Sequence, residues 1–208
     1  SESNRLVLDN IPPTVTTIVV NPTQNKNIHI PISKNKELTI DPKEGANVVL
    51  NLEEDSTVKL KQGSNTLNIE GKGIPTINAV TDDSTLNINS ITLDPSNQFK
   101  GLKSTNAKLQ INEINVLGNQ GFTGEKDKPI SCTTVKVQKD VEFTPQNINF
   151  NKARIGLGSV LKIEKSVVVD NLQVAYGKEA KNALVVFSSP FNDLTGKTIE
   201  MFTKNDNN

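Results

Sequence analysis

The sequence predicts an all-β protein, a single-domain parallel β-helix with capped ends, and three observations support this. Pairs of apolar residues two positions apart recur about every ten residues, and such pairs lie on one face of a strand. Turn-forming residues separate the pairs. The dipeptides Asn-Gly and Asp-Gly, which favour tight antiparallel hairpins, do not occur in the chain. A fixed repeat without hairpin signals is typical of stacked coils.

A four-residue strand sequence that occurs twice gives the clearest view of the repeat. Thr-Leu-Asn-Ile stands at 66–69 and again at 85–88, with its apolar residues on one face and its Asn on the other. We therefore expect Leu67 and Leu86 to stack in neighbouring coils. The same apolar pair recurs at 28–30, 38–40, 48–50, 58–60 and 77–79.

The first 26 residues differ from this repeat. Two β-rich runs, 5–11 and 14–21, are divided by Pro12 and Pro13, and prolines in tandem do not fit a central strand. We expect residues 1–26 to form an N-terminal cap or edge strands, because a solenoid must close its ends. Residues 27–203 form the predicted solenoid, and 204–208 a disordered tail.

The pattern changes in the second half of the chain. Apolar pairs at 109–111, 135–137, 161–163 and 185–187 are more widely spaced, with weaker strands between them. A full coil could contain two or three strands, and both remain open. A β-sandwich is the alternative fold, since short strands on a ten-residue beat also fit that architecture.

Two interruptions of the repeat are candidate binding loops. Residues 94–107 and 117–132 are rich in Gly and Lys, and insertions in a repeat protein commonly lie on one side and bind ligands. They supply the predicted binding residues Phe99, Lys100, Phe122 and Lys126. The alternative is that each Phe folds inward and covers the core beneath its loop.

Composition excludes several classes of function. Lys plus Arg and Asp plus Glu each total 23, so the basic field that nucleic-acid binding needs is absent. No apolar run is long enough to span a bilayer, and we expect no membrane insertion of this segment. The single Cys132 and single His29 stand far apart, which argues against a nucleophile with its base. We expect no metal site and no cofactor.

Paired carboxylates are the remaining candidates for catalysis. Asp82 and Asp83 adjoin in one predicted turn, and Glu53, Glu54 and Asp55 adjoin in another. A working pair in a glycosidase must face each other across the scissile bond, whereas neighbours in an exposed turn usually point apart. We interpret both clusters as solvated turn residues, and keep a carbohydrate-active β-helix enzyme using Asp82 and Asp83 as the alternative.

The repeated apolar pairs with Asn-rich turns resemble right-handed parallel β-helix passengers of bacterial surface adhesins and autotransporters, over about residues 27–203. The resemblance concerns the fold; the repeat core and the missing catalytic constellations lead us to expect a non-enzymatic, secreted or cell-surface solenoid that acts in adhesion or as a structural module. Its expected partner is a protein or glycan at a cell surface. The alternative enzyme would be a polysaccharide lyase or hydrolase. A fold does not by itself imply a function.

Overall fold

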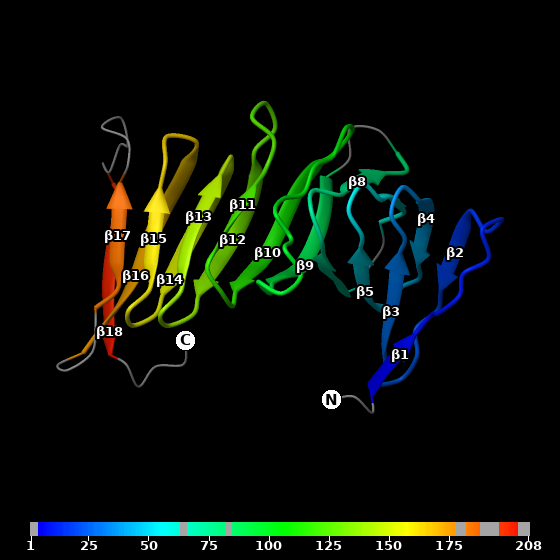
Figure 1. Cartoon of the computed structure of the whole chain (residues 1–208), viewed down its shortest axis with the longest axis horizontal. Coiled ribbons are helices and arrows are strands. Elements are labelled where there is room, and N and C mark those ends of the chain that lie inside the picture. Colours follow the sequence, from blue (N-terminus) through cyan, green and yellow to red (C-terminus); the bar gives the residue numbers. More distant parts are fainter. Residues whose placement is uncertain (1–3, 63–65, 82–84, 178–181, 188–195, 204–208) are drawn as a thin grey trace.

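The computed structural model describes residues 4–62, 66–81, 85–177, 182–187 and 196–203. The chain forms a parallel β-solenoid of about eight turns, with β1 and β2 at one end and β17 and β18 at the other (Figure 1). Every pairing between its strands is parallel within these residues, which confirms the predicted fold class. The β-sandwich alternative is wrong, because its sheets would need antiparallel neighbours.

One long sheet runs the length of the solenoid and contains ten strands. In spatial order they are β1 (Arg5–Val7), β3 (Asn27–Ile32), β5 (Asn47–Leu52), β7 (Thr66–Gly71), β9 (Thr85–Leu93), β10 (Lys108–Val116), β12 (Ile130–Val137), β14 (Ile148–Ile155), β16 (Val167–Tyr176) and β18 (Thr198–Thr203).

Two short sheets cover the other side, one for each half of the chain. The first contains β2 (Thr17–Val20), β4 (Glu37–Pro42), β6 (Thr57–Leu60) and β8 (Thr76–Ala79). The second contains β11 (Gln120–Thr123), β13 (Glu142–Gln146), β15 (Val160–Ile163) and β17 (Leu184–Phe187). Segments expected to cap the N-terminus, β1 and β2, form the first strands of the long sheet and of one short sheet. The predicted tail 204–208 lies outside the described residues.

The ten-residue repeat of the first half consists of a strand and a four-residue turn. In these turns the main-chain N–H of the fourth residue donates to the carbonyl of the first, as from Lys36 to Ser33 and from Ser56 to Glu53. The third residue has a positive φ, which favours Gly, Asn or Asp. The sequence supplies such residues ten positions apart: Asn25 (φ 57°), Asn35 (59°), Gly45 (82°) and Asp55 (58°).

The long strands of the second half bend at a corner. In β14, Asn151 and Lys152 are consecutive and both face outward, between the buried Phe150 and Ala153. The pairing of β14 with β16 skips Asn151 and continues at Lys152. A coil here has three sides, whereas a coil of the first half has two. Two and three strand segments per coil, both left open by the sequence, therefore occur in different halves.

The first of these corners corrects the predicted stacking of Leu67 on Leu86. In the structure Ile69 of β7 pairs with Ile91 of β9, and Leu86 pairs instead with Leu109 of β10. The expectation is wrong because β9 is nine residues long and Asn89 faces outward at its corner. The second copy of Thr-Leu-Asn-Ile precedes that corner and forms a side that the first half lacks.

The core consists of the inward residues of all three sheets. It is aliphatic in the first half, with Ile30, Leu50 and Ile69 fully buried, and includes Phe122, Phe143 and Phe150 in the second. The outermost coils leave equivalent positions open, so that Leu6 is 45% and Ile199 64% exposed. No helix among the described residues is long and apolar enough to cross a membrane.

Candidate functional site

The two short sheets do not meet, and residues 94–107 fill the space between β8 and β11. This segment makes isolated parallel bridges to both neighbours, pairing Lys103 with Thr76 and Gly101 with Thr123. A third bridge joins Phe99 to Gly73. The predicted loop 94–107 is therefore an irregular coil inside the stack, and we call it the junction coil.

Side-chain amides replace main-chain pairing at the β8 side of the junction coil. The Asn106 amide accepts from the main-chain N–H of Ala79 at 2.9 Å and donates to its carbonyl at 2.8 Å. Asn78 Oδ1 accepts from the N–H of Thr105 at 2.9 Å and from its hydroxyl at 3.1 Å. These bonds close the edge of β8 and satisfy polar groups that burial would otherwise penalise.

The β11 side is held by fewer bonds. Thr123 donates its amide to the carbonyl of Lys100 at 2.9 Å and accepts from the amide of Leu102 at 3.2 Å. Gln120 donates through Nε2 to the carbonyl of Phe99 at 3.0 Å. The junction coil is thus fixed against β11 near residue 123 and is joined to Gln120 only through a side chain.

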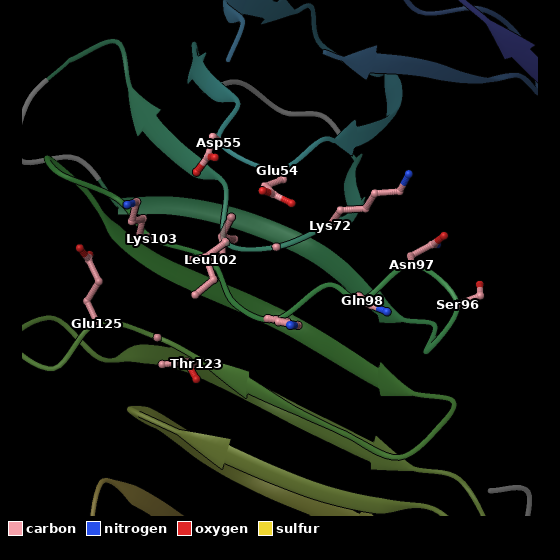
Figure 2. A pocket seen from close by; sticks show the side chains of 14 residues that line it. Glu54, Asp55, Lys72, Ser96, Asn97, Gln98, Leu102, Lys103, Thr123 and Glu125 are labelled. Carbon is pink, nitrogen blue, oxygen red and sulfur yellow. The ribbon is translucent and has the colours of Figure 1, made fainter. Parts of the chain in front are cut away.

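A groove of about 700 Å³ opens along the junction coil (Figure 2). Its walls come from the turn after β5, the segment after β7, the junction coil and the end of β11. Figure 2 shows Glu54 and Asp55 on one side of the junction coil and Glu125 on the other. The polar and charged side chains that line it are Glu54, Asp55, Lys72, Ser96, Asn97, Gln98, Lys100, Lys103, Thr123 and Glu125.

The charges in the groove differ in how far they are already paired. Glu54 contacts Lys34 at 3.5 Å, and Lys72 contacts Glu53 at 3.6 Å. Glu125 accepts from the main-chain N–H of Ser104 at 3.2 Å, which orients its carboxylate.

Two lysines of the junction coil have ammonium groups that remain available to a ligand. Lys100 and Lys103 are exposed and have no ion-pair partner among the described residues. The groove therefore offers an oriented acceptor, Glu125, and two exposed ammonium donors.

The predicted binding residues divide into two groups. Phe99 and Phe122 are completely buried, and their rings pack edge to face with centroids 5.1 Å apart, so they contribute to the core beneath the groove. Lys100 lines the groove, and Lys126 is exposed directly after Glu125. The burial of both rings agrees with the interpretation that each Phe covers the core.

Sequence reasoning considered Glu54 and Asp55 only as solvated turn residues and did not place the first half in a binding site. Glu54, Asp55 and Lys72 lie far from the two loops along the chain and reach the groove only because the coils stack. The acidic and polar residues at 53–56 were a signal for a turn, but no local pattern indicated which loop that turn would face.

Four further residues were considered for other chemistry. Asp82 and Asp83 fall outside the described residues. His29 is half-buried on β3, where burial and then the Arg5 guanidinium lower its pKa. Burial raises the pKa of the Cys132 thiol to about 12. Among the residues that the structure describes, no three His, Cys, Asp or Glu side chains are grouped to hold a metal ion.

Comparison of the chain with protein-family models, curated proteins and solved structures finds no match. We therefore infer the function from the groove and from the stack that positions it.

Proposed function

We propose that the chain is a non-enzymatic module of a secreted or cell-surface protein, which acts in adhesion by holding a partner molecule in the groove. The observation that carries this proposal is the convergence of both repeat interruptions on one flank. The junction coil and the end of β11 line the same groove, while the coils on either side stack regularly. A rigid scaffold that presents irregular polar loops is a common design for recognition.

The character of the groove supports binding of a polar, extended partner. Its lining combines ammonium groups, carboxylates and side-chain amides, and Ile74 adds an apolar surface that is 42% exposed. Ligand sites typically combine a few oriented polar groups with apolar contact area. The open form of the groove also suits a chain that passes along it. The resemblance to surface adhesins agrees with this role.

Charge reversal in the junction coil tests the proposal. We expect the double variant Lys100→Glu, Lys103→Glu to bind cells or matrix-coated surfaces at least about tenfold more weakly, because both lysines line the groove. Lys139→Glu is the matched control, since Lys139 is exposed in a turn and does not line the groove. Circular dichroism checks that all variants are folded. Equal binding by the double variant and the control would contradict the proposal.

A carbohydrate-active enzyme is the second candidate, because Asp55 and Glu125 occupy opposite sides of the junction coil in the groove (Figure 2). Two carboxylates that flank a sugar chain are the minimal machinery for glycoside cleavage. Incubation with a panel of acidic polysaccharides decides between the two candidates. Product release that is abolished by Asp55→Asn or Glu125→Gln would favour the enzyme. Product release that is abolished instead by Asp82→Asn would favour an enzyme that uses the Asp82 and Asp83 pair.

A further inference from the structure

A second hollow of about 520 Å³ continues the groove along β11. It shares Gln98, Lys100 and Thr123 with the first hollow. Its remaining walls include Phe99 and the strand residues Gln120 and Gly121. The hollow lies where the junction coil departs from β11, so part of the edge of this strand forms its wall.

The main-chain groups of Gly121 point into this hollow. In a strand, the N–H and C=O groups of alternate residues point to the same neighbour. Those of Thr123 bond to the junction coil, and the amide of Gly124 bonds to Gln146 at the end of β13. Gly121 lies two residues before Thr123, so its N–H and C=O groups also point toward the junction coil.

The junction coil does not reach Gly121. Its nearest candidate, the amide of Lys100, donates instead to Gly73 at 2.8 Å. The carbonyl of Gln98 accepts from the amide of Gly73 at 2.9 Å. Within the described part of the chain, the N–H and C=O of Gly121 have no hydrogen-bond partner. Gly121 is also exposed, so that its main chain is accessible to a partner.

A side-chain acceptor beside Gly121 is also unsatisfied. The Nε2 of Gln120 donates to the carbonyl of Phe99 at 3.0 Å, which fixes the orientation of its carboxamide. Its Oε1 is buried and has no partner. A buried acceptor without a donor is unfavourable, and a bound N–H or O–H group would relieve it. This observation is independent of the strand edge.

We infer that the hollow receives an extended peptide segment of a partner protein, which adds as a short strand beside β11 at Gly121. This inference rests on the proposed function and names the class of its ligand. An extended main chain supplies a donor and an acceptor to one side at every second residue, which matches the N–H and C=O of Gly121. Lys100, exposed at the rim, favours an acidic side chain next to that contact.

Amide hydrogen exchange in the chain alone provides the first test. The amide of Gly121 should exchange at least about a hundredfold faster than that of Phe122. Phe122 lies two residues before Gly124, so its main-chain N–H points toward β13. Heteronuclear NMR of the labelled full chain measures both rates. Similar protection of the two amides in the free chain would overturn the inference, because the edge at Gly121 would then already be paired.

Peptide binding provides the second test. A displayed library of random twelve-residue peptides is selected on the full chain, and enriched peptides are synthesised. Their binding should slow the exchange of the Gly121 amide. Methylation of each peptide main-chain nitrogen in turn should weaken binding about tenfold or more at the one nitrogen that donates to the Gly121 carbonyl, and little at the adjacent residues. An effect independent of position, or no enriched peptide, would overturn the inference.

A glycan array separates this inference from the proposed function. If oligosaccharides bind, and Lys100→Glu with Lys103→Glu abolishes their binding while the Gly121 amide stays unprotected, the groove is a glycan site and the peptide inference fails alone. If neither peptides nor glycans bind, and the double variant adheres to cells as well as Lys139→Glu does, both the peptide inference and the proposed function fail.

Discussion

The two halves of the solenoid use coils of similar length in different ways. In the first half Ile28 stacks on Val48, and in the second Ile148 stacks on Val167, so that both coils are about twenty residues long. The first half divides its coil into two strands and two four-residue turns. In the second half, the coil of β12 and β13 consists of a long bent strand, one four-residue turn, a short strand and the single corner residue Asn147 (φ 56°).

The difference in cross-section determines which side chains fill the core. Two-sided coils bring opposite strands close together and are filled by Ile, Leu, Val and Ala. Three-sided coils enclose a wider space, and Phe143 and Phe150 meet there with ring centroids 6.5 Å apart. Interiors are packed to crystal-like density, so a wider section needs larger residues. Shape, rather than coil length, therefore separates the two halves, and the groove lies where one shape changes into the other.

Removal of an aromatic side chain from the wide section should have the largest effect. Phe150→Ala leaves a cavity and should lower the free energy of unfolding by about 3–5 kcal/mol. Phe150 pairs with Cys132, whose buried thiol should react with thiol reagents only when this region opens. We expect urea to unfold the variant at lower concentration, and its Cys132 to be labelled faster.

A matched change in the other half controls for global opening. Leu50→Ala also creates a cavity, but nearest-neighbour coupling in a solenoid should confine much of its effect to the first half. We expect Cys132 labelling to respond less to Leu50→Ala than to Phe150→Ala. Equal acceleration by both variants would show that the halves open as one unit.

Overpacking of the narrow section should have the next largest effect. Leu50→Phe adds volume between two closely spaced strands and should cost about 1–3 kcal/mol of stability. Urea unfolding measures this loss, and Leu50→Ile is the control of nearly equal volume. If the narrow half accepts Phe without loss, the link between cross-section and residue size fails.

Loss of the amide that closes β8 tests the boundary between the halves. Asn106→Ala leaves the N–H and C=O of Ala79 without their partners and should cost about 1–3 kcal/mol. Hydrogen exchange should speed up at the Ala79 amide. Asn112→Ala, at an exposed corner of β10, is the control and should change the exchange rate of the Ala79 amide little. Unchanged protection at Ala79 would mean that the side-chain amide does not close the edge.

The turns of the first half should respond to backbone strain alone. A Cβ at Gly45 would meet Pro22 at an ordinary contact distance of 3.6 Å, so Gly45→Ala adds no steric clash. Its φ of 82° should still cost about 1–2 kcal/mol, because an L-residue disfavours this region. Thermal unfolding measures the change, and Asn35→Gly at the equivalent turn position should show no comparable loss.

A surface ion pair of the second half should have the smallest effect. Glu113 contacts Lys136 at 2.7 Å on the next coil, and this hydrogen bond holds the pKa of Glu113 below its usual range. A lowered folded-state pKa stabilises the fold above the unfolded-state pKa, and this contribution disappears as the pH falls through the folded-state value. Glu113→Gln should cost at most about 1 kcal/mol at pH 7 and nothing at pH 2, as urea titrations at the two pH values can measure.

The sequence alone determined an all-β chain of short repeated strands and favoured the parallel β-helix, because the alternation of inward and outward residues is local. Apolar pairs such as Leu38 with Ile40 mark the inward row, and residues such as Asn35 and Gly45 mark turns, within a few positions of the chain. Both signals follow from strand geometry and from the φ preference of single residues. They required no knowledge of neighbouring coils.

Only the tertiary structure decided the register and the groove. Leu67 failed to stack on Leu86 because a corner at Asn89 shifted the pairing, and a corner is visible only when the next coil lies beside it. Asp55 and Lys100 share a groove although they are far apart in the chain. Such contacts depend on the summed geometry of several coils, which no local pattern encodes. The sequence thus determined that the chain coils, and the stacking of those coils determined where a partner could bind.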